Sequence, residues 1–117
     1  TIDRIIDVFP PDQQQQVRIQ LAAVLECVVS QQLIRKEQGG RVAALEVLFA
    51  NNAVRNLIRE GKTFQIPSVM QTSRRSGMIT MDDALYDLFM GGQISAEAAV
   101  TYAQDPVSMN KKVNFEI

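Results

Sequence analysis

Three short groups of residues in this chain have side chains that could do chemistry. Gly61-Lys62-Thr63 has the last three residues of a phosphate-binding P-loop, Cys27 carries the only thiol, and Asp82-Asp83 is a pair of carboxylates. A P-loop needs an earlier glycine at fixed spacing, because its backbone N–H groups must surround the phosphates. Asn56 stands at that position. We therefore expect the tripeptide to end one helix and start the next, and we predict no nucleotide site there.

The chain has no histidine, and this removes several further kinds of active site. No histidine base can activate Cys27, and neither a Ser-His-Asp triad nor a histidine-ligated zinc can form. Asp82-Asp83 follows Thr80, a pattern typical of helix capping. We predict no catalytic, cofactor-binding or metal-binding residue, and we expect Cys27 to be a small core residue.

Composition narrows the class of protein further. The 117 residues are 46% hydrophobic and 21% charged, which is typical of a globular domain, and the net charge is −1. This balance lacks the basic field of a nucleic-acid-binding protein. No apolar run approaches the ~18 residues of a membrane span. We therefore predict no nucleic-acid partner and no membrane insertion, and the single cysteine fits a reducing compartment.

Apolar spacing predicts two helices before any strand. Residues 2–9 carry one helical stripe that Pro10-Pro11 ends. Asp12 begins a longer helix. Its expected stripe is Val17, Leu21, Val24, Leu25 and Val28.

Two strands are predicted next, over about residues 32–36 and 41–49, joined by a turn at Gly39-Gly40. After Arg41 the second run is apolar except for Glu46, which suits a strand buried on both faces. Two strands alone are marginally stable in water. We therefore expect this ribbon to form the edge of a larger sheet whose other strands are encoded upstream.

The remaining sequence predicts helices over about residues 53–60, 64–75, 81–89 and 95–104, with a weakly ordered tail after Met109. The first of these helices divides into two sides. Ala53, Val54, Leu57 and Ile58 form its expected packed stripe, whereas Arg55, Asn56, Arg59 and Glu60 lie opposite. Two arginines four residues apart repel mildly unless an anion or partner lies close. A solvated polar face is the simpler interpretation.

Three segments resemble one known family. Ala53-Val54-Arg55-Asn56-Leu57-Ile58-Arg59-Glu60 resembles the AIRNLIRE-type segment of the twitching-motility (PilT) ATPases of the secretion superfamily, with Val54 in place of isoleucine. Residues 1–10 resemble the stretch after that family's histidine box, and residues 76–82 resemble a later segment. In this family the helix motif is implicated in pilus retraction, so the resemblance implies that its polar side contacts a partner.

The resemblance implies an α+β, mostly α-helical fold: the C-terminal part of a RecA-like P-loop ATPase core, followed by a helical appendage. Residues 1–50 would end the ATPase core and residues 51–117 would form the helical C-terminal subdomain. The parent protein would be an ATPase that uses ATP and Mg²⁺, whereas this chain, without a Walker A motif, would not hydrolyse ATP by itself. Its implied partners are the upstream ATPase domain, neighbouring subunits of a homohexamer and the pilus platform at the cytoplasmic face of the inner membrane.

Assembly and secretion ATPases of this superfamily typically carry a tetracysteine zinc element near the ribbon. No cysteine occurs in residues 28–49, which favours the retraction subgroup.

A self-contained helical adaptor without enzymatic activity is the alternative. Methionines at helical spacing can line an adaptable apolar groove for a partner helix. Four of the five methionines would supply that groove: Met70, Met78, Met81 and Met90.

Overall fold

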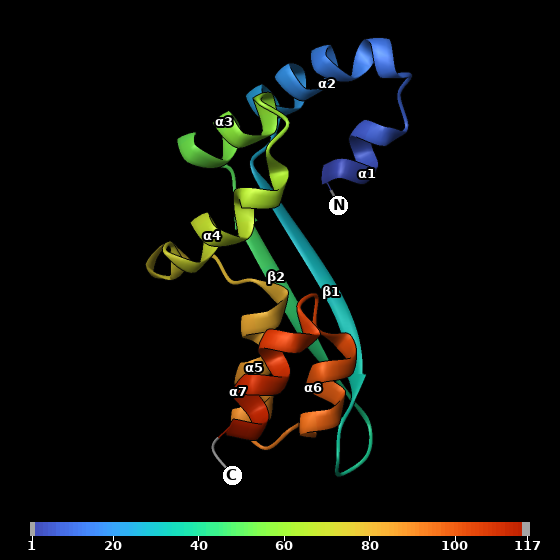
Figure 1. Ribbon diagram of the computed structural model, residues 1–117, viewed down its shortest axis with the longest axis vertical. Helices are drawn as coiled ribbons and strands as arrows, with labels where there is room; N and C mark the ends of the chain where they lie inside the picture. The colour runs from blue at the N-terminus through green and yellow to red at the C-terminus, as the bar shows by residue number, and fades with distance from the viewer. Residues whose placement is uncertain (1, 116–117) are drawn as a thin grey trace. The chain divides into compact units, whose positions relative to one another are not determined.

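A computed structural model describes residues 2–115, which form helices and one two-stranded ribbon (Figure 1). These residues form two compact units, each built from two separate stretches of sequence. Unit 1 takes in residues up to 28 together with residues 47–78, and unit 2 combines residues 29–46 with residues from 79 onward. Residues on both sides of the predicted boundary at residue 50 therefore contribute to unit 1.

The ribbon pairs β1 (Cys27–Arg35) with β2 (Arg41–Phe49). Backbone hydrogen bonds flank the ladder at both ends, from Ala50 N to Glu26 O (3.0 Å) and from Lys36 N to Gly40 O (2.9 Å). Both strands have nine residues, so the antiparallel ladder runs between these bonds without a bulge. Within residues 2–115 the sheet has only these two strands, as expected for the ribbon.

The turn between the strands explains the glycine pair. Gly39 N donates to Lys36 O (3.2 Å), which closes a four-residue turn, and Gly39 has a φ of +94°. A turn followed by a left-handed residue is a common hairpin connection, and glycine adopts that conformation without strain. The Glu37 N–H, inside the turn, donates to Gln93 O of the same unit (3.2 Å).

The first strand begins earlier than the sequence pattern predicts. β1 starts at Cys27, so Cys27 and Val28 belong to a strand and not to the preceding helix, and Cys27 is exposed instead of buried. Valine and cysteine fit a strand as readily as a helical stripe, and the apolar spacing did not distinguish the two.

The ribbon is covered on one face only, which corrects the expectation that β2 is buried on both faces. Ile34, Ala44 and Leu48 are buried, and alternate residues on the same strands are exposed. Val29 is 60% exposed and Leu33 52% exposed. Within residues 2–115, one face of the ribbon therefore exposes apolar side chains to solvent.

Unit 1 holds the helices α1 (Ile2–Asp7), α2 (Pro11–Val24), α3 (Asn52–Arg59) and α4 (Ile66–Gln71). Two 3₁₀ turns, η1 (Thr63–Gln65) and η2 (Arg74–Ser76), flank α4. The predicted continuous helix over residues 64–75 is thus broken, with Pro67 in the first turn of α4. The core of unit 1 contains Ile6, Ala22, Leu48, Val54, Ile58, Met70 and Met78.

The first helix is shorter than predicted. α1 ends at Asp7, Ile2 and Ile6 are buried, and Ile5 and Phe9 are each 40% exposed. Only half of the expected apolar stripe therefore packs within this unit.

Unit 2 holds α5 (Met81–Met90), α6 (Ala96–Tyr102) and α7 (Pro106–Phe115). The predicted weakly ordered tail is wrong over residues 110–115, because α7 continues through them. Met109 and Val113 of α7 are almost fully buried. The other core residues are Ile34, Ala44, Met81, Ala84, Leu85, Ile94 and Ala99.

Carboxylate side chains accept hydrogen bonds from backbone N–H groups at the helix starts and connections of unit 2. Glu46 accepts a hydrogen bond from the Met81 N–H at the start of α5 (3.0 Å). Asp82 accepts from the N–H groups of Gln104 (2.8 Å) and Asp105 (3.0 Å), and thereby holds the link between α6 and α7. As predicted, the Thr80 side chain caps α5, through the Asp83 N–H. The carboxylates singled out in the sequence therefore stabilise helix starts and connections.

No helix in the described range combines the length and the apolarity that crossing a membrane requires.

Candidate functional site

The helix that carries the eight-residue motif, α3, has a defined beginning and end. The Asn51 side chain accepts a hydrogen bond from the Val54 N–H (2.9 Å), which caps the start. At the other end Gly61, with a φ of +71°, lets the chain turn back. Lys62 N then donates to Leu57 O (2.8 Å) and Gly61 N to Ile58 O (3.2 Å), the pattern of a Schellman motif.

Every carbonyl in the last turn of α3 has a donor. Glu60 N donates to Asn56 O (3.0 Å), and the Schellman bonds satisfy the next two carbonyls. The last one, Arg59 O, accepts from the Gln15 side chain of α2 (3.0 Å). Helix ends leave such carbonyls unpaired unless other groups reach them. The end of α3 is therefore fully hydrogen-bonded within unit 1.

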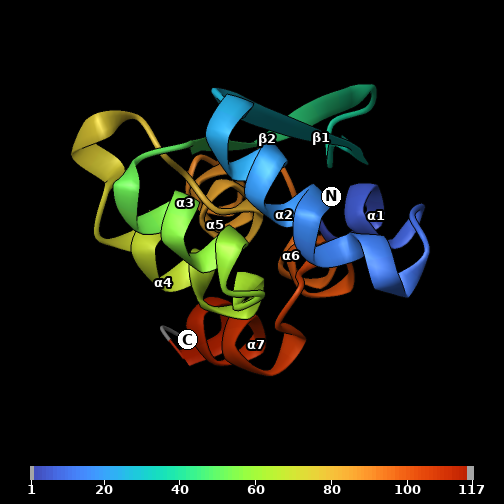
Figure 2. The ribbon, with the colours of Figure 1, turned by 90° about the horizontal axis from the view of Figure 1, so that it is seen from above.

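In a second hydrogen bond between α2 and α3, the donor belongs to α3 and the acceptor to α2. The Arg55 guanidinium donates to Ala22 O near the end of α2. Because residue 15 meets residue 59 and residue 22 meets residue 55, the two helices run antiparallel, side by side in both views (Figures 1 and 2). The Ala22 residue is fully buried, so its carbonyl depends on this guanidinium.

The apolar side of α3 is narrower than the sequence predicts. Val54 and Ile58 are fully buried and Leu57 is half-buried, as expected for packing residues. Ala53, expected on the same stripe, is exposed.

The polar residues of the motif fall into two groups. Arg55 is half-buried and bonded to α2. Asn56, Arg59 and Glu60 are exposed, and the Arg59 guanidinium donates to the Asn56 side-chain oxygen. The Asn56 amide therefore holds the Arg59 guanidinium in one orientation. Only the exposed group is free to meet a partner.

Two residues of α2 outside its predicted apolar stripe, Gln15 and Arg18, belong to the same surface. Gln15 joins the end of α3, and its oxygen faces the Arg18 guanidinium (3.5 Å). A Cβ added at Gly61 would lie 3.6 Å from Arg18 Nε, so the Arg18 side chain passes over this glycine. A run of glutamines carries no local sign of such long-range contacts, and antiparallel pairing of the two helices was the missing information.

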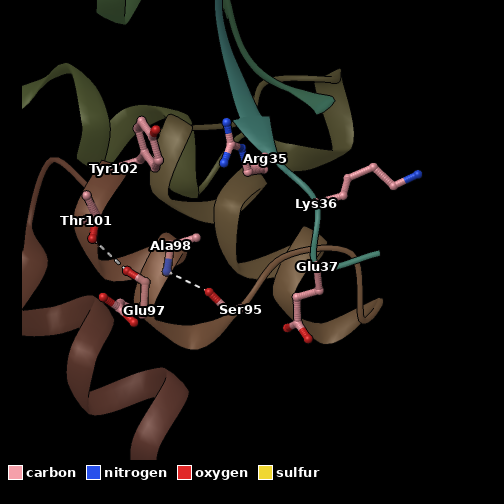
Figure 3. Close-up of a pocket in the computed structure, with 8 residues that line it drawn as sticks. All are labelled: Arg35, Lys36, Glu37, Ser95, Glu97, Ala98, Thr101 and Tyr102. Atoms are coloured by element: carbon pink, nitrogen blue, oxygen red, sulfur yellow. Dashed lines mark hydrogen bonds between the residues drawn. The ribbon is translucent and has the colours of Figure 1, made fainter. Parts of the chain in front are cut away.

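A pocket of about 320 Å³ lies in unit 2 (Figure 3). Arg35, Lys36, Glu37 and Glu97 are among its lining residues, so its charges balance. Two of its hydroxyl groups are already hydrogen-bonded: the Ser95 oxygen accepts from the Ala98 N–H, and the Thr101 hydroxyl donates to Glu97 O. Lys36 extends away from the residues of α6 in Figure 3. The pocket therefore presents no convergent set of reactive groups.

The proposed methionine groove is not formed in residues 2–115. Met70, Met78 and Met81 are almost fully buried in the two cores, and of the four only Met90 is exposed. They serve as core residues, and the adaptor hypothesis loses its binding surface.

The fold and the sequence together define the class of protein. The chain has the fold of the C-terminal part of the ATPases PilT and DotB, a two-stranded ribbon with helices. The crystal structure of the pilus retraction motor PilT with bound ADP superposes on 92% of the chain with a TM-score of 0.79 and 46% identity. The Legionella pneumophila ATPase DotB, 21% identical with a TM-score of 0.63, shares the fold.

Sequence relatives then specify the family. The chain is 51% identical over 111 residues to a twitching motility protein of Neisseria gonorrhoeae, which is 94% of the chain and 30% of that protein. It is 47% identical over 106 residues to the type IV pilus retraction ATPase PilT of Pseudomonas aeruginosa, 91% of the chain and 31% of the relative. No protein-family model matches the sequence. The predicted resemblance is confirmed: over nearly its whole length this chain is similar to the C-terminal portion of PilT-type retraction ATPases.

Proposed function

We propose that this chain is the C-terminal part of an ATP-driven motor that retracts type IV pili in twitching motility. The similarity to the Neisseria gonorrhoeae twitching motility protein, 51% over 111 residues, carries this proposal. The chain spans about 30% of the length of that relative, so the activity is proposed for the longer protein that contains it.

In that longer protein the remaining sequence supplies the nucleotide site, with ATP and Mg²⁺ as its ligands. The related retraction motor was crystallised with ADP, which supports a nucleotide site in the parent protein. Residues 1–50 end its ATPase core and residues 51–117 form its helical C-terminal subdomain. The exposed apolar side chains of the ribbon, Val29 and Leu33 among them, fit a sheet that continues in upstream sequence.

The polar side of α3 is the proposed contact surface of this part of the motor. Asn56, Arg59 and Glu60 are exposed on a helix that Asn51 caps at its start and whose C-terminal carbonyls are all hydrogen-bonded. A rigid helix of this kind suits the transfer of motion between parts of an assembly. Its proposed partners are a neighbouring subunit of a homohexameric ring, another domain, or the pilus platform, and its place is the cytoplasmic face of the inner membrane.

The test is the substitution Arg59→Ala in the full-length protein. We expect twitching to be strongly reduced, because the exposed guanidinium is lost from the contact surface, while the affinity for ATP stays unchanged. The matched control is Arg75→Ala, another exposed arginine of unit 1. Normal motility combined with weakened ATP binding in Arg59→Ala would contradict the proposal.

A further inference from the structure

Three cations gather at the C-terminal end of α3. Arg59 is its last residue, Lys62 closes its Schellman motif, and Arg18 of α2 passes over Gly61 between them. The only acidic side chain of this end is Glu60, which pairs with Lys62 at 3.7 Å; both side chains are more than half exposed. Such an exposed pair contributes little to stability. We call Arg18, Arg59 and Lys62 the α3-end basic cluster.

Neither guanidinium of this cluster has a carboxylate partner in residues 2–115. Arg59 is bonded to the Asn56 amide, and Arg18 faces the Gln15 amide at 3.5 Å. Asp3 of α1 contacts Thr63, the residue after Lys62. Its carboxylate accepts a hydrogen bond from the Thr63 hydroxyl (2.8 Å). Two arginines are therefore held in place by neutral amides, with further N–H donors left over.

Helix capping does not account for these cations. A cation at the end of a helix can bind its last carbonyls. Here the last four carbonyls of α3 already accept from backbone N–H groups and from Gln15. The guanidiniums of Arg18 and Arg59 thus remain available to an outside acceptor.

We infer that the α3-end basic cluster binds an acidic segment of a partner protein, one with at least two carboxylates. Planar guanidiniums take carboxylates in bidentate pairs, and the amides beside them fix their orientation. Polybasic membrane sites use about four to eight lysines and arginines, whereas this cluster has three cations, which favours a peptide over a lipid surface. This inference rests on the proposed function, because it names the chemistry of the partner that the polar side of α3 meets.

The experiment uses the full-length protein and a fluorescent octaglutamate peptide as the probe, with binding measured by anisotropy at low salt. We expect the double substitution Arg18→Glu and Arg59→Glu to weaken binding at least about tenfold, since close charge pairs dominate such contacts. Binding by the unsubstituted protein should also fall steeply at about 0.5 M salt, because exposed charges are screened. The matched control is Arg74→Glu with Arg75→Glu, the exposed arginine pair of η2.

Each other outcome overturns the inference. Equal loss of peptide binding in the control pair would show attraction by general charge, and unchanged binding in Arg18→Glu/Arg59→Glu would show that the cluster is not the site. Phosphatidylserine-containing vesicles that bind through Arg18 and Arg59 while the peptide does not would assign the surface to lipid. The proposed function is tested separately by motility: a protein that retracts pili but does not bind the peptide refutes this inference alone.

Discussion

Removal of the Arg55 guanidinium should loosen the contact between α2 and α3. The substitution Arg55→Met keeps the aliphatic stem but deletes the donor to Ala22 O, and Ala22 is fully buried. A buried carbonyl left without a donor costs about 1–3 kcal/mol. Arg55 is half-buried, so water replaces the lost donor only in part.

The assay is hydrogen exchange of the amides at the end of α2 in the full-length protein. A loss of about 1–3 kcal/mol corresponds to exchange that is about 5- to 150-fold faster if opening is local. The matched control is Arg59→Met, because Arg59 is exposed and its side chain bonds only within α3. A pair within one helix contributes about 0.2–0.5 kcal/mol, so the control should change exchange by no more than about twofold.

Equal acceleration in both variants, or none in Arg55→Met, would refute this account of Arg55. The result also bears on retraction. Loss of motility in Arg55→Met would then follow from a loosened unit 1, whereas loss of motility in Arg59→Met would indicate a missing contact.

Three further outcomes are expected. Gly61→Ala should destabilise unit 1 by roughly 1–2 kcal/mol, because alanine is strained at a φ of +71°, and a chemical melt of the full-length protein measures this; a gain in stability would contradict the Schellman assignment. Asp82→Ala should cost about 1–3 kcal/mol locally and speed hydrogen exchange in α7, because two N–H groups lose their acceptor; unchanged exchange in α7 would contradict this role of Asp82. Hydrogen bonds from the Ser108 side chain, and then from its backbone N–H, lower the pKa of Asp105 below its ordinary value. The ionised Asp105 carboxylate caps the start of α7 through these bonds. This stabilisation is complete above the ordinary pKa of aspartate and is lost as the pH falls through the lowered value. Ser108→Ala should therefore raise the pKa of Asp105 measured by NMR titration; an unchanged pKa would show that the hydroxyl is not the cause.

Local signals predicted most of the helices and the turn. Asn51, Thr80 and Gly61 each fix a helix end through contacts within a few residues, so their sequence neighbours are sufficient to predict them. The motif helix and its buried pair Val54 and Ile58 follow from helical spacing in the same way.

Contacts between distant residues were not predictable from that local pattern. Cys27 and Val28 continue the apolar spacing of α2, yet they form a strand because Phe49 and its neighbours pair with them across the turn. Helix α7 starts with a local signal, Asp105 as its cap followed by Pro106, but its later turns are stabilised by the burial of Met109 and Val113 against other helices of unit 2. Arg55 looked like a surface residue because its acceptor, Ala22 O, lies 33 positions away along the chain.

The alternation of the two units along the polypeptide restricts how this protein can be dissected or recombined. The chain passes between them at residues 28/29, 46/47 and 78/79. No single cleavage or truncation point can release either one intact, and a chimera that exchanges only the last forty or so residues with a homologue would combine donor helices with a recipient hairpin. Modular exchange therefore has to transfer residues 29–46 and the C-terminal stretch together, and engineered retraction motors should be spliced accordingly.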